Sequence, residues 1–157
     1  SKLPLGHHLQ RIDRAVFALA VFQIVRRCDA FVLNMNGRVP DEGAVAEAGI
    51  AFAAGRTVVL YKDDYRTTFD GRDNSMITGL SVLEPVRDRR HLSLALHQAD
   101  EVLRSRHPCP APGLSGHLSG VAEKGERIWR IIGSNPLKNL GRREIMPLFR
   151  EIVDLAD

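Results

Sequence analysis

The sequence predicts an α/β fold in which a doubly wound, mostly parallel sheet is flanked by helices. Two short apolar runs, residues 30–35 and 57–61, have the composition of buried strands. A helix-like segment separates them, and further amphipathic segments precede and follow them. The 157 residues, 44% hydrophobic and 26% charged, are enough to form a globular core without cross-links.

The first half of the chain predicts a strand–helix–strand unit behind an N-terminal helix. Residues 8–27 carry apolar side chains at helical spacing. Residues 41–43 then place acidic side chains at a helix start, where the helix dipole favours them, and residues 44–54, largely Ala and Gly, continue that helix. The two strands should therefore be parallel, with a right-handed crossover.

The second half predicts mainly helices. Residues 62–79 form a long polar connection, a kind that is usually functional in compact domains. The other predicted elements are an edge strand at residues 81–86 that Pro85 disturbs, a helix at 89–106, a linker at 108–120 and helices at 121–132 and 144–155. These features favour a flavodoxin-like α/β domain over residues 1–107 and extra C-terminal helices, residues 108–157, packed on the same domain.

Composition argues against nucleic-acid polymers and membranes as partners. The net charge of +3 comes mainly from short arginine runs such as residues 87–90, which have no neighbouring aromatic residues to stack on bases. No apolar run approaches the roughly 20 residues that span a bilayer. Cys28, Cys109 and the six histidines show no metal-ligand spacing, so no metal is expected. A reduced cytoplasmic setting is the simpler interpretation of the two cysteines, and a disulfide is the alternative.

Two carboxylates lie where the predicted fold would bind a ligand. Open α/β sheets bind ligands at the carboxyl ends of their strands, beside helix N-termini. Glu47 lies among Ala and Gly residues in the most apolar helix, where a carboxylate is costly unless it is paired or used. Asp41, in the preceding loop, can fold back toward Glu47, and paired carboxylates are what retaining glycosidic chemistry requires. The alternative is that Glu47 faces solvent or an arginine and Asp41 only caps the helix.

The connection after the second strand adds further polar candidates. They are Asp63, Asp64, Arg66, Asp70, Asp73 and Asn74. The simplest structural role for Arg66 is an ion pair with Asp64 or Asp70.

The segment from Asp29 to Gly79 resembles the nucleoside 2-deoxyribosyltransferase family. In that family an Asp precedes an apolar strand, followed by Asp-x-Gly-x-x-x-Glu-x-Gly-x-Ala-x-Ala-x-Gly and a second strand. The present chain has this pattern at Asp41, Gly43, Glu47, Gly49, Ala51, Ala53 and Gly55. Asp64-Tyr65-Arg66 and Asn74-Ser75-Met76 are similar to the family's later Asp-x-Arg and Asn-x-Met motifs.

The resemblance implies roles for the two carboxylates. Glu47 would be the nucleophile that attacks C1′ of the deoxyribose and forms a covalent ester, later split by an incoming base or by water. Asp41 matches the second carboxylate, which would hydrogen-bond the substrate and help proton transfer to the leaving base. The substrates implied are 2′-deoxynucleosides and free nucleobases, with no metal or organic cofactor.

The resemblance also implies binding residues and an assembly. Asn74 and Met76 match residues that a neighbouring subunit donates, with Asn74 at the sugar 5′-hydroxyl, so a homo-oligomer is expected. Gly43 and Asp29 are the other predicted substrate-binding positions. The alternatives are a turn role for Asn74, within good turn chemistry, and a core role for Met76.

The chain departs from the family pattern in two places. Family members open with a strand that lines the nucleoside pocket, and residues 1–9 contain no such pattern. The position that presents an Asp or Asn to the base is close to Val21 here. Three hypotheses therefore stand beside one another: deoxyribose transfer, hydrolysis of deoxynucleosides or deoxynucleotides, and a non-catalytic nucleotide-binding subunit.

Overall fold

The computed structural model describes residues 5–67, 71–106, 113–134 and 142–155. Its elements, in chain order, are the helix α1 (Leu5–Phe22), a π-helical turn η1 (Gln23–Arg27), the strand β1 (Ala30–Asn34), α2 (Glu42–Ala53), the strand β2 (Thr57–Tyr61), α3 (Ser75–Thr78), a 3-10 turn η2 (Arg89–His91), α4 (Leu92–Arg106), α5 (Gly116–Ser134) and α6 (Arg142–Leu155). The contacts between these elements divide the chain into two compact units. One holds residues 28–113, and the other joins residues 1–27 to residues 114–157.

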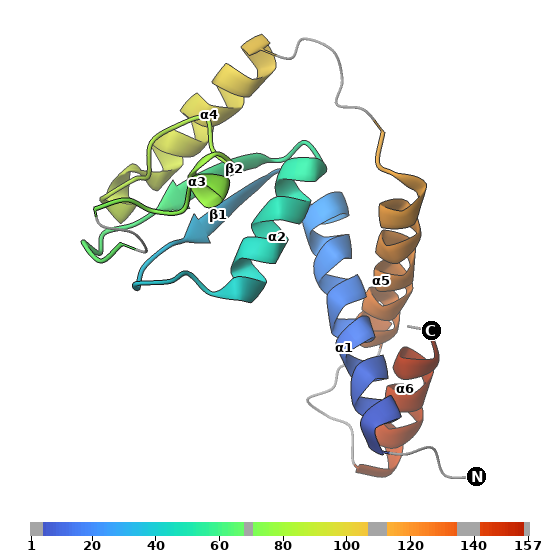
Figure 1. The fold of residues 1–157 in the computed structure, drawn as a ribbon. Helices are drawn as coiled ribbons and strands as arrows, with labels where there is room; N and C mark the ends of the chain where they lie inside the picture. Colours follow the sequence, from blue (N-terminus) through green and yellow to red (C-terminus); the bar gives the residue numbers. More distant parts are fainter. Residues whose placement is uncertain (1–4, 68–70, 107–112, 135–141, 156–157) are drawn as a thin grey trace. The chain divides into compact units, whose positions relative to one another are not determined.

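The first unit is a small α/β layer structure (Figure 1). β1 and β2 pair in parallel, with Ala30 opposite Thr57 and Asn34 opposite Tyr61. Helix α2 connects them, as the predicted strand–helix–strand unit requires, and contacts both strands. Helix α4 packs on β2 through a cluster of buried and partly buried apolar residues: Val59, Val82, Leu83, Val86, Leu92, Ala95, Leu96 and Ala99. The α/β class is thus confirmed, and the wider doubly wound, flavodoxin-like sheet stays a prediction.

Helix α2 has a defined cap at each end. Asp41 is the N-cap, and its side chain accepts a hydrogen bond from the backbone N–H of Ala44. At the other end Gly55 takes a left-handed φ of 71°, which an L side chain rarely adopts. The N–H groups of Gly55 and Arg56 then donate to the carbonyls of Phe52 and Ala51, which is a Schellman motif. These caps fix where the crossover helix begins and ends.

Residues 81–86 do not form the predicted edge strand. Only Val86 forms a parallel bridge, to Tyr61, within the described structure. Its N–H donates to Leu60 and its carbonyl accepts from Lys62. The chain bends at residues 82 and 83, and this bend ends the pairing before a second bridge can form.

The second unit is helical. Helices α1 and α5 pack along each other, and α6 contacts both. Its core combines Ala15, Ala18 and Ile128 with partly buried Leu19, Val121, Ile132, Ile152 and Leu155. Arg27 lies over the ring of Trp129, 5.1 Å from its centroid, in a cation–π contact. The described part of α1 therefore contacts the C-terminal helices, and the predicted domain boundary at residue 107 stays a prediction.

Helix α5 begins earlier than predicted. The linker was expected to reach residue 120, but the helix starts at Gly116. Ser115 explains the difference, because its hydroxyl accepts from the N–H of Leu118 and so caps the first turn. Residues 108–112 of the predicted linker lie outside the described residues, and so does Cys109, whereas Cys28 is a free thiol.

Close approach of α1 and α5 depends on Gly125. A Cβ built there would lie 2.0 Å from the carbonyl oxygen of Ala18 and 2.6 Å from the Cβ of Phe22. Both distances are far below van der Waals contact, so an added methyl group would force the helices apart.

We expect Gly125→Ala to destabilise the helical unit by about 1–3 kcal/mol. The matched control is Gly120→Ala on the same helix, where an added Cβ meets nothing within 4 Å. The control should be neutral or more stable by up to about 1 kcal/mol, because alanine favours helix. Urea unfolding followed by the fluorescence of Trp129, the single tryptophan, measures both. Equal stability of the two variants would contradict the predicted clash.

Candidate active site

The candidate site is built at the carboxyl ends of the two parallel strands. The register that pairs Asn34 with Tyr61 brings the loop after β1 and the loop after β2 to the same edge of the sheet. One further backbone bond, from the N–H of Met35 to the carbonyl of Tyr61 at 2.8 Å, extends the pairing into the loops. Ligands of open α/β sheets bind at this edge.

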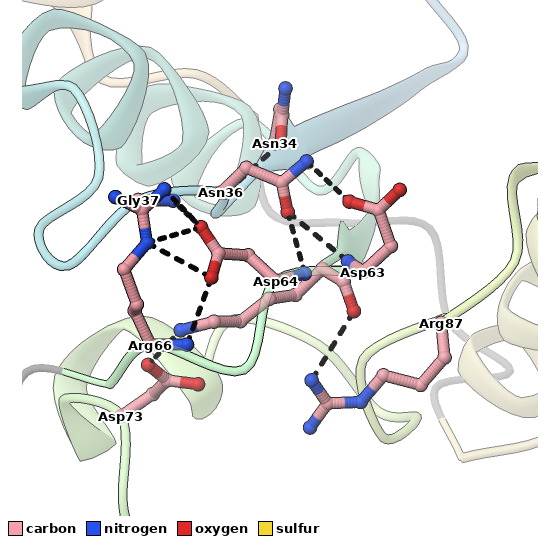
Figure 2. Close-up of polar contacts among 9 residues, drawn as sticks. Asn34, Asn36, Gly37, Asp63, Asp64, Arg66, Asp73 and Arg87 are labelled. Carbon is pink, nitrogen blue, oxygen red and sulfur yellow. Dashed lines mark hydrogen bonds and ion pairs between the residues drawn. The ribbon is translucent and has the colours of Figure 1, made fainter.

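Asn36 joins the two loops through its side chain (Figure 2). Its Oδ1 accepts hydrogen bonds from the backbone N–H groups of Asp63 and Asp64, at 3.1 and 3.2 Å. Its Nδ2 donates to Asp63 Oδ1 at 2.6 Å, and its own N–H donates to Asn34 Oδ1 at 3.0 Å. One amide side chain thus holds the start of the second loop against the first.

Asp64 reinforces this junction. Its Oδ2 accepts from the N–H of Gly37 at 3.0 Å, across the two loops (Figure 2). The Arg66 guanidinium binds both of its oxygens. The Arg66 side chain, the Arg66 N–H and the Gly37 N–H all stabilise the charged form and hold the pKa of Asp64 well below its ordinary value. The predicted ion pair between Arg66 and Asp64 is confirmed, and Asp70 lies outside the described residues.

Asp63 is held from both sides. The Tyr61 hydroxyl donates to its Oδ2 at 2.6 Å, and Asn36 donates to its Oδ1. The hydrogen bond from Tyr61 lowers the pKa of Asp63 most, and the hydrogen bond from Asn36 lowers it further. The hydrogen bond to Asp63 also raises the pKa of Tyr61. Both residues therefore help to hold the start of the loop after β2.

Lys62 forms a buried ion pair with Asp73. Their Nζ and Oδ1 atoms lie 2.5 Å apart, and the side chains are 1% and 9% exposed. Lys62 follows β2 directly, and Asp73 directly precedes Asn74, so the pair closes the second loop at its base. Both residues belong to the segment predicted as a polar loop, and nothing in the sequence indicates their contact, because burial of a lysine beside a strand end has no local signature.

Asp41, Gly43 and Glu47 belong to the first two turns of α2. Asp41 Oδ1 accepts from the Ala44 N–H at 2.8 Å, so the capping role that was the alternative prediction is observed. A Cβ at Gly43 would lie 3.2 Å from that oxygen, which explains why glycine suits this position. Glu47 is partly buried on a helix whose Ala48 and Ala51 are fully buried. Within the described ranges it has no hydrogen-bond or ion-pair partner, neither an arginine nor another group.

Asn74 and Met76 stand at the start of the short helix α3. Asn74 is its N-cap, and its Oδ1 accepts from the Met76 N–H at 2.9 Å. The Met76 side chain is 81% exposed, so the core role that was the alternative prediction is wrong. Asn74 has the predicted turn role, and its Nδ2 group has no partner among the described residues.

Asp29 is not brought to this edge. It directly precedes β1, whereas Asp41 and the loop residues follow the other ends of the strands. The five residues of β1 separate the two edges by about 16 Å. Of the six predicted site residues, Asp41, Gly43 and Glu47 follow the carboxyl end of β1 in chain order. The Lys62–Asp73 pair relates Asn74 and Met76 to the carboxyl end of β2, and Asp29 lies at the opposite end of β1. Val21 is buried in α1, in the other compact unit.

No helix in the described ranges is long and apolar enough to cross a bilayer. No group of three or more His, Cys, Asp or Glu side chains there could hold a metal ion.

We expect the stability of the protein to fall as pH drops below about 4, in part through Asp64. Its pKa is lowered in the folded state, so the unfolded chain binds the proton first and acid favours unfolding. Asp64→Asn should be less stable than wild type at pH 7, and the difference should shrink at pH 3. Urea unfolding at both pH values measures this, with Glu101→Gln, at an exposed position on α4, as control. A difference that stays constant or grows at low pH would contradict the assignment.

The family model described as nucleoside 2-deoxyribosyltransferase matches residues 4–106, about two thirds of the chain. The searches of curated proteins and of solved structures gave no match. The matched segment includes β1, α2, β2 and the start of α3, where the predicted motifs lie. Because it covers more than half of the sequence, the chain belongs to the nucleoside 2-deoxyribosyltransferase family.

Proposed function

We propose that the protein transfers 2-deoxyribose between nucleobases, with Glu47 as the nucleophile that forms a covalent glutamyl-deoxyribosyl intermediate. The observation that carries this proposal is the environment of the Glu47 side chain. It is partly buried on a helix of small apolar residues and has no polar partner in the described part of the chain. Its carboxylate oxygens are not buried, and no group in the described ranges occupies them. A nucleophile needs its oxygens available to substrate.

The reaction has two balanced halves. First, a Glu47 oxygen attacks C1′ while the bond from C1′ to the base nitrogen breaks, and the base leaves with the electron pair and takes up a proton. Then a nitrogen of the incoming base attacks C1′, the ester bond breaks, Glu47 regains its negative charge and the new base loses a proton. A carboxylate beside C1′ also stabilises the positive charge that develops on the sugar.

Asp41 supports proton transfer and sugar binding in this proposal. The helix cap uses Oδ1 only, and Oδ2 has no partner among the described residues. An exposed carboxylate fixed by a backbone hydrogen bond presents its free oxygen in one direction. Gly43 permits this arrangement, because a side chain there would crowd the carboxylate.

The proposed active unit is a homo-oligomer in which Asn74 and Met76 complete a neighbour's site. Met76 is an exposed apolar residue, and Asn74 beside it retains two amide hydrogens to donate. An exposed methionine next to an unused amide is what a surface offered to a second copy would present. We place the reaction in nucleotide salvage, in the reduced cytoplasm that the two distant cysteines favour.

The first test is product analysis with 2′-deoxyinosine, with and without added adenine or cytosine. A new deoxynucleoside that requires the added base is expected from wild type. Glu47→Ala should lower kcat/KM by at least about 1,000-fold, and Asp41→Asn by about 100-fold or more, since asparagine keeps the helix cap. Glu42→Gln is the matched control, because Glu42 is an exposed carboxylate on the same helix, and it should retain wild-type activity.

The outcomes separate the hypotheses. Release of hypoxanthine without exchange would replace the transferase by a hydrolase that passes the intermediate to water. Full activity of Glu47→Ala would reject Glu47 as nucleophile. Lack of turnover with several deoxynucleosides and their monophosphates would favour a nucleotide-binding subunit.

A mixing experiment tests the shared site. Glu47→Ala and Asn74→Ala should each be inactive, and a co-refolded 1:1 mixture should recover about a quarter of wild-type activity. In that mixture a quarter of the sites combine Glu47 of one protomer with Asn74 of its neighbour. Glu47→Ala mixed with Asp41→Asn is the control and should recover nothing, since both changes affect the same side of a site. No recovery in the first mixture would place Asn74 in the site of its own chain, whereas an active Asn74→Ala variant would place it outside the site.

A further inference from the structure

Stability of the loop does not by itself require an ion pair at the buried positions of Lys62 and Asp73. Removing a lysine and an aspartate from water costs several kcal/mol for each ion, and apolar side chains of similar volume can often replace such a pair without loss. An ion pair differs from an apolar contact in being short and directional. The 2.5 Å contact between Nζ and Oδ1 therefore defines one position for Asp73 relative to the end of β2.

Lys62 is itself held by its backbone. Its N–H donates to the carbonyl of Val86 at 2.9 Å, and its carbonyl accepts from the Arg87 guanidinium at 3.2 Å. The side chain is 1% exposed, so it has little freedom to move. Lys62 is thus fixed relative to the end of β2 and to Val86, and its ion pair fixes Asp73 relative to the same groups.

Asp73 is joined directly to the residues of interest. The next residue, Asn74, is the N-cap of α3, and its side chain holds the N–H of Met76. Helix α3 has only four residues, which is too short to hold its own position. The other end of the loop is bound separately, through Asn36 and Gly37 to Asp63 and Asp64. Beside the burial of Ile77, the Lys62–Asp73 pair is the polar contact of the described residues that sets where Asn74 and Met76 lie.

We propose that Lys62 and Asp73 are positioning residues, which fix Asn74 and Met76 for use in the active site. This inference rests on the proposed function, because only in that function do the positions of Asn74 and Met76 affect catalysis. Neither Lys62 nor Asp73 contacts substrate in this proposal. Their effect on catalysis passes through α3.

The test uses the double variant Lys62→Met/Asp73→Leu, in which apolar side chains replace both ions. Amide hydrogen exchange at Met76, Ile77 and Thr78 should become at least about tenfold faster, while the thermal unfolding temperature stays close to that of wild type. Transferase kcat/KM should fall at least about tenfold, because displacement of a positioning group by about 1 Å has effects of that size or larger. Arg90→Met, which breaks an exposed ion pair with Asp88 in the same compact unit, is the control and should change neither quantity.

Mixing shows on which side of a site the defect lies. The double variant combined with Glu47→Ala should recover about a quarter of wild-type activity, and combined with Asn74→Ala it should recover none. Recovery in the opposite pattern, or wild-type exchange and activity in the double variant, would overturn the proposal. If the double variant does not fold, Lys62→Gln/Asp73→Asn, which keeps a hydrogen bond without charges, gives the same two readouts.

Failure of the proposed function would be recognised separately. A wild-type protein without deoxyribosyl transfer would reject that function, whereas the exchange rates of α3 would still report whether Lys62 and Asp73 hold it. Unchanged exchange in both double variants would overturn the positioning role whatever the activity of the wild type.

Discussion

Every feature of the candidate site depends on the parallel pairing of β1 with β2 in a single register. Because Asn34 lies opposite Tyr61, the two following loops start side by side and Asn36 can reach the backbone of Asp63 and Asp64. A shift of one residue would turn the side chains of a strand to the opposite face of the sheet and separate these groups. Leu33 on β1 opposes such a shift, because it is fully buried between the exposed Val32 and Asn34 and would move to their face of the sheet.

The polar contacts at this edge differ in how they affect the stability of the fold. The pair of Asp64 with Arg66 is partly exposed, and such pairs contribute little to stability. Lys62 and Asp73 are almost completely buried, where loss of one partner would leave an uncompensated charge. The loop after β2 is thus held by an exposed polar junction at one end and a buried ion pair at the other. Asn74 and Met76, to which the proposed function gives a role at the substrate, follow directly after the second of these points.

The helix α2 serves both fold and chemistry. Its small residues allow Ala48 and Ala51 to pack in full contact with their surroundings, and the same composition leaves Glu47 without a neighbour to neutralise it. Asp41 caps the helix with one oxygen and keeps the other, so a single carboxylate can stabilise the helix start and face a ligand. Structural and catalytic uses of these carboxylates are therefore compatible.

The sequence by itself determined the strand–helix–strand unit, the limits of α2 and the chain order of the motif from Asp41 to Met76. These follow from local rules, namely apolar periodicity, helix capping and the left-handed conformation of Gly55. Only the tertiary structure decided that residues 81–86 form a single bridge, that α1 packs with α5, and that Asn36 and Lys62 organise the site edge. It also placed Asp29 at the far end of β1. Those outcomes depend on contacts between residues that are far apart in the sequence, and local propensity does not determine such contacts.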